Sequence, residues 1–433
     1  MVLYESTRGG KEGISSAEAI KRGISPNGGL YVPQQIKELT LKDISELVNM
    51  TYAQRAVFIL KRYLDDFTED ELIDCVNNAY NTDKFSNNDI AHVNSINESL
   101  CLLELWHGPT CAFKDMALQI LPHFLVKAME KTGEKSEIVI LVATSGDTGK
   151  AALEGFAGVK GTRIIVFYPE DGVSEVQKYQ MITQTGENVK VVGVKGNFDD
   201  TQSGVKKIFT DKELIQEMAK ENLKFSSANS INWGRLVPQI VYYFSAYADL
   251  IKGNRIKVGD KVNFVVPTGN FGNILAGYYA KCMGLPVNKL ICASNDNNVL
   301  TDFIRTGSYD KRRKFIKTVS PSMDILISSN LERLLYELTD HDHKKVSDWM
   351  NRLNEAGHYE IGQNLLNRLH KIFWAGWSNQ DETLKTIECV YEDNNYILDT
   401  HTAVAVDVYD KYVITTGDLT PSVILSTASP FKF

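Results

Sequence analysis

The sequence predicts an α/β fold in which helices flank two open twisted sheets, with an N-terminal region before them and a helical insertion in the second. Short apolar runs such as EIVILVAT alternate with helical stretches, which is the pattern of a parallel sheet covered by helices. This alternation occurs in two separate parts of the chain, which indicates two sheets. A chain of 433 residues also exceeds what one hydrophobic core usually holds, so we expect separate lobes.

Four segments follow one another along the chain. Residues 1–95 alternate turns with amphipathic helices, as in TLKDISELVNMTYAQRAVFILKRYL. Residues 96–230 form the first strand–helix set, a smaller lobe with the apolar runs SLCLLELW, EIVILVAT, TRIIVFYP and NVKVVGV. Residues 231–433 form the second set, a larger lobe with KVNFVVPTGN, KLICASN and the closing PSVILSTASPFKF. Inside it, residues from about 300 to 390 are largely polar and helical, so we expect an inserted helical subdomain there.

Composition and charge exclude several classes of protein. The net charge of −7 and the lack of a basic stripe argue against nucleic-acid binding. No apolar run reaches the roughly 18 residues of a membrane span, and MVLYESTRGG lacks the apolar core of a secretory signal. The six cysteines show neither a CxxC pair nor the spacing of a zinc site. We therefore expect a cytoplasmic monomer or homodimer without a metal, a nucleic-acid partner or a membrane partner.

The stretch HGPTCAFKDMALQ places a lysine where its charge is poorly hydrated. Lys114 stands between Phe113 and Asp115 at the start of a helix, just after a Gly-Pro turn. An ordinary surface charge near a turn is one interpretation. The other is that the amine of Lys114 is a nucleophile.

A strand that ends in polar residues provides the first candidate anion site. In LVATSGDTGKAALEGFAG, the residues from Thr144 to Gly149 lie between a strand and an alanine-rich helix, whose N–H groups and dipole suit a carboxylate or phosphate. A P-loop is excluded because Thr144 replaces its first glycine and Ala151 replaces its magnesium-binding hydroxyl. A helix that is merely well capped remains the alternative.

The second candidate anion site is the turn in VVPTGNFGNILAGYY. Gly269 and Gly272 flank Asn270 and Phe271, and Asn273 stands at the start of the next helix. Glycines let a backbone approach a phosphate closely, although an ordinary strand–helix loop would explain the pattern equally well. Two anion sites and a poorly hydrated lysine are together what a protein needs to hold an aldehyde cofactor as a Schiff base.

Several motifs resemble the threonine synthase family, pyridoxal-phosphate enzymes of fold type II. They are YESTRGG, NGGLYVP, HGPTCAFKD, TSGDTG, NSINWGR, TGNFGN, SPSMDILISSNLERLLYEL and STASPFKF, and they cover nearly the whole chain in the expected order. Cys111 stands where the family more often has a larger apolar residue, and Asn27 where it often has aspartate. Neither departure touches the reacting groups.

The resemblance implies pyridoxal 5'-phosphate as the cofactor and assigns residues to it. Lys114 would form the Schiff base, with Phe113 fixing its direction, and Asp147 would lie near the cofactor hydroxyl. Thr427 would lie beside the pyridine nitrogen, which implies a largely unprotonated ring, because a hydroxyl cannot hold a proton there as a carboxylate can. The turn that would bind the cofactor phosphate consists of Gly269, Asn270, Phe271, Gly272 and Asn273.

The resemblance also assigns residues to the substrate. Thr144, Ser145 and Thr148 would receive the α-carboxylate. Arg235, with Ser230 and Asn232, would bind the substrate phosphate, because a guanidinium group matches phosphate geometry. Asn270 would bridge the two sites. For Arg235 the alternative is a structural salt bridge.

Two groups of histidines are expected to lie outside the chemistry. His107 precedes the Gly-Pro turn and is expected to be a hydrogen-bonded structural residue. DHDHKK at residues 340–345 is expected to be a solvated face, with no metal.

The implied reaction converts O-phospho-L-homoserine and water to L-threonine and phosphate by γ-elimination and β-addition, the last step of threonine biosynthesis. One alternative is another fold-type-II lyase, such as a threonine or diaminopropionate ammonia-lyase, which would need no phosphate site for its substrate. The other is a cofactor-binding relative that has lost catalysis and serves as an interaction protein. The intact Lys114, Asp147 and Arg235 argue against the second alternative.

Overall fold

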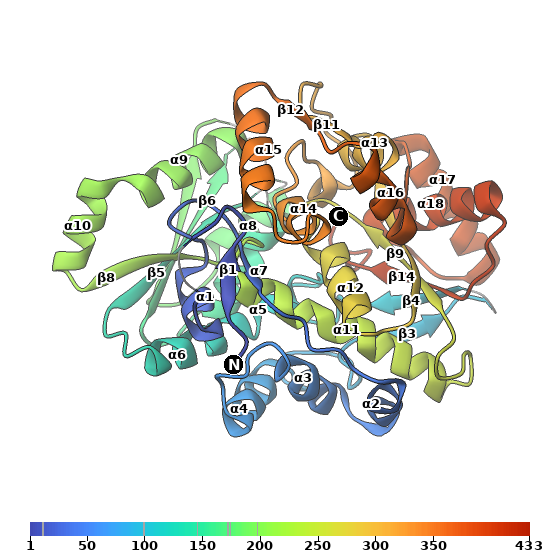
Figure 1. The fold of residues 1–433 in the computed structure, drawn as a ribbon, viewed down its shortest axis with the longest axis horizontal. Helices are drawn as coiled ribbons and strands as arrows, with labels where there is room; N and C mark the ends of the chain where they lie inside the picture. Colours follow the sequence, from blue (N-terminus) through green and yellow to red (C-terminus); the bar gives the residue numbers. More distant parts are fainter. Residues whose placement is uncertain (11–12, 98–99, 145, 171–172, 174, 197) are drawn as a thin grey trace.

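The computed structural model describes residues 1–10, 13–97, 100–144, 146–170, 173, 175–196 and 198–433. Within these residues the main architecture is a four-stranded and a six-stranded sheet, each flanked by helices, as Figure 1 shows. The predicted fold class, two open sheets flanked by helices, is confirmed. No helix of the described residues combines the length and the apolar character needed to cross a membrane.

The four-stranded sheet is parallel throughout and is covered on both faces. Its strand order is β7 (Val189–Val194), β6 (Thr162–Pro169), β5 (Glu137–Ala143) and β8 (Leu223–Ser227). Alternate residues of β5 enter different cores, since Ile138 and Ile140 join the central core whereas Val139 and Leu141 pack under the outer helices. This burial on both sides explains the continuous apolar run of β5. The accompanying helices are α6 (Leu121–Lys131), α7 (Asp147–Phe156), α8 (Glu175–Ile182), α9 (Phe198–Thr210) and α10 (Lys212–Lys220).

The six-stranded sheet is parallel except at one edge. Its order is β13 (Phe373–Trp377), β10 (Val287–Ser294), β9 (Val262–Pro267), β14 (Ser422–Ser426), β4 (Leu100–Glu104) and β3 (His92–Ser95), and β3 pairs antiparallel with β4. Its helices are α11 (Trp233–Lys252), α12 (Gly272–Cys282), α13 (Val299–Thr306), α16 (Gln363–Ile372), α17 (Gln380–Asn394) and α18 (Thr400–Thr416).

One expected strand pairs in the other sheet, and the expected insertion is not purely helical. The strand β4, expected in the smaller lobe of residues 96–230, pairs with β14 in the six-stranded sheet. The expected insertion from about 300 to 390 contains η2 (Pro321–Met323), α14 (Leu331–Leu338), α15 (His343–Glu355) and a small sheet of β11 (Ser308–Asp310) and β12 (His358–Glu360). It also contains β13, which pairs with β10 in the main sheet, so this segment is part of the lobe rather than an appendage. The exact lobe boundaries stay a prediction.

The N-terminal region packs against the central helix α11. It contains β1 (Tyr4–Ser6), α1 (Ser16–Arg22), β2 (Tyr31–Pro33), α2 (Leu41–Glu46), η1 (Leu47–Asn49), α3 (Tyr52–Leu60) and α4 (Glu69–Ala79). The ring of Trp233, at the start of α11, is fully buried against the rings of Tyr4, Tyr63 and Tyr279. Aromatic pairs of this kind add stability beyond their buried area. They fix the start of α11, which also carries Arg235.

The histidines of the two motifs, His107 and His341, lie in different environments. His107 contacts the Glu104 carboxylate at 2.8 Å and stacks on Trp106. In DHDHKK, Asp340 and residues 343–345 are exposed as expected, whereas the ring of His341 lies between the carboxylates of Glu5 and Glu337 at 2.6 and 3.3 Å. These hydrogen bonds raise the pKa of His341 to about 9 and join α14 to β1.

Candidate active site

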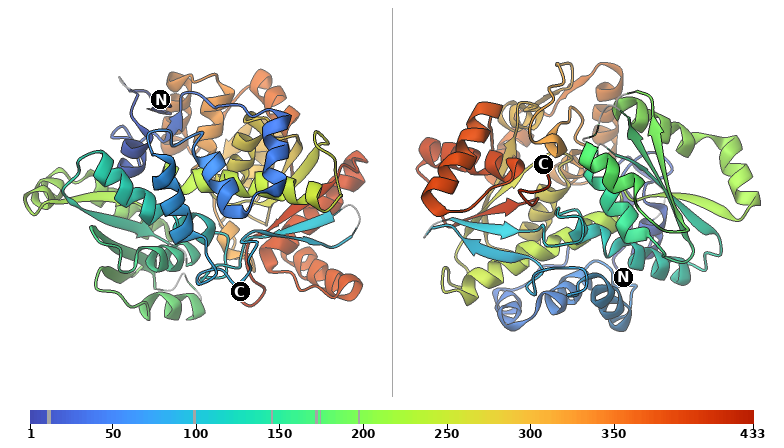
Figure 2. Two further views of the ribbon diagram at one scale, coloured as in Figure 1. Left: turned by 90° about the horizontal axis from the view of Figure 1, so that it is seen from below. Right: turned by 180° about the vertical axis from the view of Figure 1, so that it is seen from behind.

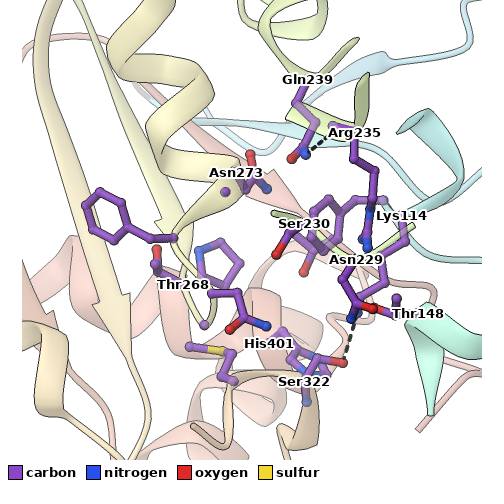
Figure 3. A pocket seen from close by; sticks show the side chains of 18 residues that line it. Lys114, Thr148, Asn229, Ser230, Arg235, Gln239, Thr268, Asn273, Ser322 and His401 are labelled. Carbon is purple, nitrogen blue, oxygen red and sulfur yellow. Dashed lines mark hydrogen bonds between the residues drawn. The ribbon is translucent and has the colours of Figure 1, made fainter. Parts of the chain in front are cut away.

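A pocket opens between the two sheets at the carboxyl ends of β9 and β14, the usual position for a ligand in an open α/β sheet. Figure 3 shows the side chains that line it, drawn from both lobes. Those lining residues are Phe113, Lys114, Thr148, Asn229, Ser230, Arg235, Gln239, Pro267, Thr268, Gly269, Asn270, Phe271, Gly272, Asn273, Ser322, Met323, His401 and Thr427.

The loop before α5 (Asp115–Leu118) is held by a buried carboxylate. Asp115 accepts hydrogen bonds from the backbone N–H and the hydroxyl of Thr110, at 2.8 and 2.7 Å. Gly108 lies directly on this side chain, and a Cβ there would be 2.6 Å from the Cβ of Asp115. The Gly-Pro turn therefore brings the chain close enough to Asp115 to fix the direction in which Lys114 leaves the loop.

Replacing Gly108 by alanine is expected to destabilise the fold by about 1–3 kcal/mol, because the added methyl group overlaps buried atoms. Urea unfolding would measure the change. The matched control is Gly204→Ala in α9, where an added Cβ meets nothing within 4 Å and alanine favours the helix by up to about 1 kcal/mol. Equal stability of the Gly108→Ala and unaltered proteins would contradict the role of this close approach.

The amine of Lys114 is buried at the centre of the site. Its Nζ donates to Oδ2 of Asp147 at 3.1 Å and to Oγ of Ser322 at 3.4 Å. Burial lowers the pKa of Lys114, the Asp147 carboxylate opposes that shift, and the charge of Arg235 adds to it. The predicted nucleophile therefore lies inside the site, in a dry environment that lowers its pKa, rather than on the surface.

Asp147 lies at the N-terminus of α7 and gathers several donors. Ser322 donates to its Oδ2 at 2.6 Å, Gln177 donates to its Oδ1 at 3.2 Å, and the ammonium of Lys432 lies 3.5 Å from Oδ1. Burial alone would raise the pKa of Asp147, but the charges of Lys114 and Lys432 hold it well below its usual value. The site therefore contains a fully ionised carboxylate beside the lysine.

The turn of residues 269–273 has a geometry that only some residues can adopt. Phe271 caps α12 in the left-handed conformation with φ 62°, and a Cβ on Gly269 would lie 2.8 Å from the carbonyl oxygen of Ser322. Ser328 donates to the carbonyl of Gly269 at 2.7 Å, and Asn330 donates to that of Asn270. The segment before α14 therefore holds the turn so that the free N–H groups of the α12 N-terminus face the pocket.

The side-chain amide of Asn273 adds a hydrogen-bond donor to this turn. Its Oδ1 accepts from the hydroxyls of Tyr242 and Tyr243 at 2.6 and 3.0 Å, which fixes the amide orientation. Among the described residues its buried Nδ2 has no hydrogen-bond partner. A buried donor left unpaired is costly, so an acceptor belongs beside it.

Arg235 is a buried cation without a buried anion. Its Nη1 donates to the carbonyl of Ala228 at 2.9 Å, and within the described part of the chain its Nε has no partner and no carboxylate lies within 4.0 Å of it. Burial lowers its pKa to about 10. The structural salt bridge weighed for Arg235 is thus absent among the described residues, and the guanidinium is available to an anionic ligand (Figure 3).

The structure places most of the predicted site residues at the pocket and two of them outside its lining. Phe113, Lys114, Thr148, Ser230, Arg235, Thr427 and the turn 269–273 all line the pocket, and Asp147 contacts Lys114. Thr144 does not line it, and its buried hydroxyl accepts the N–H groups of Gly146 and Gly149 at 2.9 Å. Ser145 lies outside the described residues.

Asn232 is the second predicted residue that lies outside the pocket lining. It caps α11 by accepting the N–H of Gly234, and its Nδ2 donates to the carbonyls of Ile20 and Ser227. All of its polar atoms are engaged in these bonds, and it does not line the pocket. In this structure these bonds fix the start of α11, and a role of Asn232 in substrate binding stays a prediction.

Several site residues escaped the sequence-based prediction. Asn229, Gln239, Ser322 and His401 line the pocket. His401 accepts the backbone N–H of Ser322 on Nε2, at 3.1 Å, so Nδ1 carries the proton and donates to Asp399 at 2.9 Å. The polar stretches SPSMD and DTHTA hold Ser322 and His401, and polar residues beside apolar elements were the available indication.

Comparisons with known proteins agree on one family. A family model described as "Threonine synthase N terminus" matches residues 3–80, and one described as "Pyridoxal-phosphate dependent enzyme" matches residues 82–357. Threonine synthase of Saccharomyces cerevisiae is 38% identical, over 100% of this chain and 87% of its own length. Human threonine synthase-like 1 is 43% identical over 96% of this chain, but the chain spans only 56% of that relative. The crystal structure of PLP-bound threonine synthase from Brucella melitensis superposes with a TM-score of 0.90 at 38% identity, covering 99% of this chain and 89% of that one.

Proposed function

Because the chain belongs to the threonine synthase family of pyridoxal-phosphate-dependent enzymes, we propose that it converts O-phospho-L-homoserine and water to L-threonine and phosphate. The observation that carries this proposal is the buried guanidinium of Arg235, which faces the same pocket as the Lys114 amine and lacks a carboxylate partner among the described residues. A substrate with both an amine and a phosphate satisfies the two groups at once.

The residues of the pocket fit the cofactor of this family. Lys114 provides the buried amine that would hold the cofactor aldehyde. The N-terminus of α12 and the unpartnered Nδ2 of Asn273, within the part of the chain described, would receive the cofactor phosphate. Thr427 lines the pocket and would lie beside the pyridine nitrogen. Pyridoxal phosphate, when bound, supplies an electron sink for the bonds around the substrate α-carbon.

The chain's own residues would bind the substrate and move its protons. Thr148 and the N-terminus of α7 receive the α-carboxylate, while Arg235 and Ser230 receive the phosphate. The freed amine of Lys114 takes the proton from Cα, a role that its lowered pKa favours because the neutral form is the base. Asp147 and Ser322 hold that amine in place by the hydrogen bonds described above.

We further propose that the chain acts in the cytoplasm on this small molecule, as a monomer or a homodimer. All six cysteines are unpaired thiols, which supports a reducing compartment. Light scattering of the purified chain would separate the two oligomeric states.

An assay of O-phospho-L-homoserine with the cofactor-loaded protein tests the proposed function. We expect equal amounts of phosphate and threonine to appear, because water must add at Cβ after phosphate leaves. Phosphate together with a 2-oxo acid would mean that the site eliminates phosphate without adding water. Ammonia and 2-oxo acid from threonine, with no phosphate released from phosphohomoserine, would favour the ammonia-lyase alternative instead.

A further inference from the structure

The segment that follows β14 forms one wall of the active site and is fixed along the Lys114 loop. Phe113 donates its backbone N–H to the carbonyl of Thr427 at 2.8 Å, and Ser429 donates to the carbonyl of Cys111 at 3.0 Å. Between these bonds, Ala112 and Ala428 form an antiparallel bridge. Residues 427–429 are therefore tied to the loop that ends at Lys114, and the backbone of Lys432 returns to Ser429.

This arrangement buries a second lysine beside the first. The side chain of Lys432 is 1% exposed. Its ammonium donates to the carbonyl of Thr110, the residue that holds Asp115, and lies 3.5 Å from Oδ1 of Asp147. A lysine is almost never fully buried unless its charge is paired, so the Asp147 contact accounts for its position.

Asp147 thus has a different ammonium on each of its oxygens. Lys114 donates to Oδ2 and Lys432 faces Oδ1. If Lys114 is covalently engaged, as the proposed function requires, its amine no longer supplies a fixed charge to this carboxylate. The only other full positive charge that the described residues place within 4.0 Å of Asp147 is that of Lys432.

We propose that Lys432 is a positioning residue of this active site, whose fixed charge keeps Asp147 ionised and aligned on Ser322 and Lys114 throughout the reaction. The inference rests on the proposed role of Lys114. The segment after β14 would then supply a fixed positive charge to the site, in addition to the proposed contact of Thr427 with the cofactor.

The charges around Lys432 set the direction of its effect. Its ammonium lowers the pKa of Lys114 by repulsion and that of Asp147 by attraction. It also acts on the carboxyl of Asp115 and the thiol of Cys111, while the charge of Arg235 acts on Lys114 and the ring of His401 is a further titratable group near Asp147. Removing the Lys432 charge should therefore raise the pKa of Lys114, so that less free amine is present at a given pH.

The test measures Lys114 in the cofactor-free protein, without any assay of activity. Competitive labelling with acetic anhydride, followed by mass spectrometry of the peptide that contains Lys114, gives the pKa of its amine from the pH dependence of labelling. In Lys432→Met we expect this pKa to rise, so that less free amine is present and labelling of Lys114 is slower at a given pH below the pKa. Lys432→Arg keeps the charge and is expected to keep the pKa of Lys114 near its original value.

An unchanged Lys114 pKa in a folded Lys432→Met protein would overturn the proposal. It would show that Lys432 contributes packing only and that its charge does not act on the site. Lys432→Gln is the second variant, and its expected shift is the same. If both neutral variants fail to fold while Lys432→Arg folds, the lysine serves the stability of the fold and the proposal is also overturned. Absence of threonine formation would contradict the proposed function without altering this measurement.

Discussion

Lys114→Ala is expected to lower the rate of phosphate release from O-phospho-L-homoserine by at least about 10³-fold, because it removes both the covalent anchor and the base. Among the described residues, no other amine of the site can replace it. Arg235 does not lose its proton at neutral pH, and Lys432 is engaged with Asp147 and with the carbonyl of Thr110. Steady-state release of phosphate, followed with and without added cofactor, measures the change.

Covalent labelling separates loss of the amine from loss of the fold. Borohydride treatment of the cofactor-loaded protein should leave the mass of the reduced cofactor on the peptide of Lys114, and this label should be absent from Lys114→Ala. Lys224→Ala, an exposed lysine of β8, is the matched control and should keep both the label and the rate. A Lys114→Ala protein that still took up the label, or still released phosphate at the original rate, would show that another residue is the anchor.

The parts of the fold that could be predicted from the sequence are those whose burial leaves a local pattern of apolar residues. β5 is covered on both faces, so every residue from Ile138 to Ala143 is apolar and the strand is visible as a run. The place of a strand in a sheet leaves no such local trace. β4 is followed in the sequence by the first lobe, yet its partner β14 lies more than three hundred residues later. Long-range pairing of this kind is decided by packing, not by local sequence.

The site was predictable where a residue stands at a strand end or in a Gly-rich turn. Lys114, Asp147 and the turn 269–273 were predicted in this way. Lys114 and the turn line one pocket, and Asp147 contacts Lys114. Ser322 and His401 were missed because they come from segments far apart in the sequence, which meet only when the backbone N–H of Ser322 reaches His401. Neither residue belongs to a local pattern that distinguishes a ligand-binding group from a turn or a cap.

The two predicted residues outside the pocket lining occupy the same kind of position. Thr144 and Asn232 both lie at helix entrances that face the site, where polar side chains either bind ligand or cap the helix. The residue type does not distinguish a cap from a ligand-binding group, because the preferred capping residues are also good ligands. The Thr144 hydroxyl accepts two backbone N–H groups at the entrance of α7, and Asn232 caps α11 with its Oδ1 while its Nδ2 donates to the carbonyls of Ile20 and Ser227.

Arg235→Met is expected to weaken binding of O-phospho-L-homoserine about 10- to 100-fold, the usual effect of losing a charge-assisted hydrogen bond of roughly 1.5–3 kcal/mol. Binding of the cofactor should be unchanged, because the turn 269–273 and Lys114 are intact. Inorganic phosphate provides a direct readout. It should raise the unfolding temperature of the unaltered protein, since it binds the folded state, and should raise that of Arg235→Met much less.

The same variant decides between the two interpretations of Arg235. A guanidinium that is buried without a carboxylate among the described residues costs stability, so an apolar side chain of similar length should leave the free energy of unfolding unchanged or higher. A structural ion pair would behave in the opposite way, with a loss of about 3–5 kcal/mol when one partner is removed. Arg163→Met, an exposed arginine paired with Glu137, is the control and should change neither phosphate binding nor stability by much. A large loss of stability in Arg235→Met, with phosphate binding preserved, would mean that the substrate phosphate is held elsewhere in the pocket.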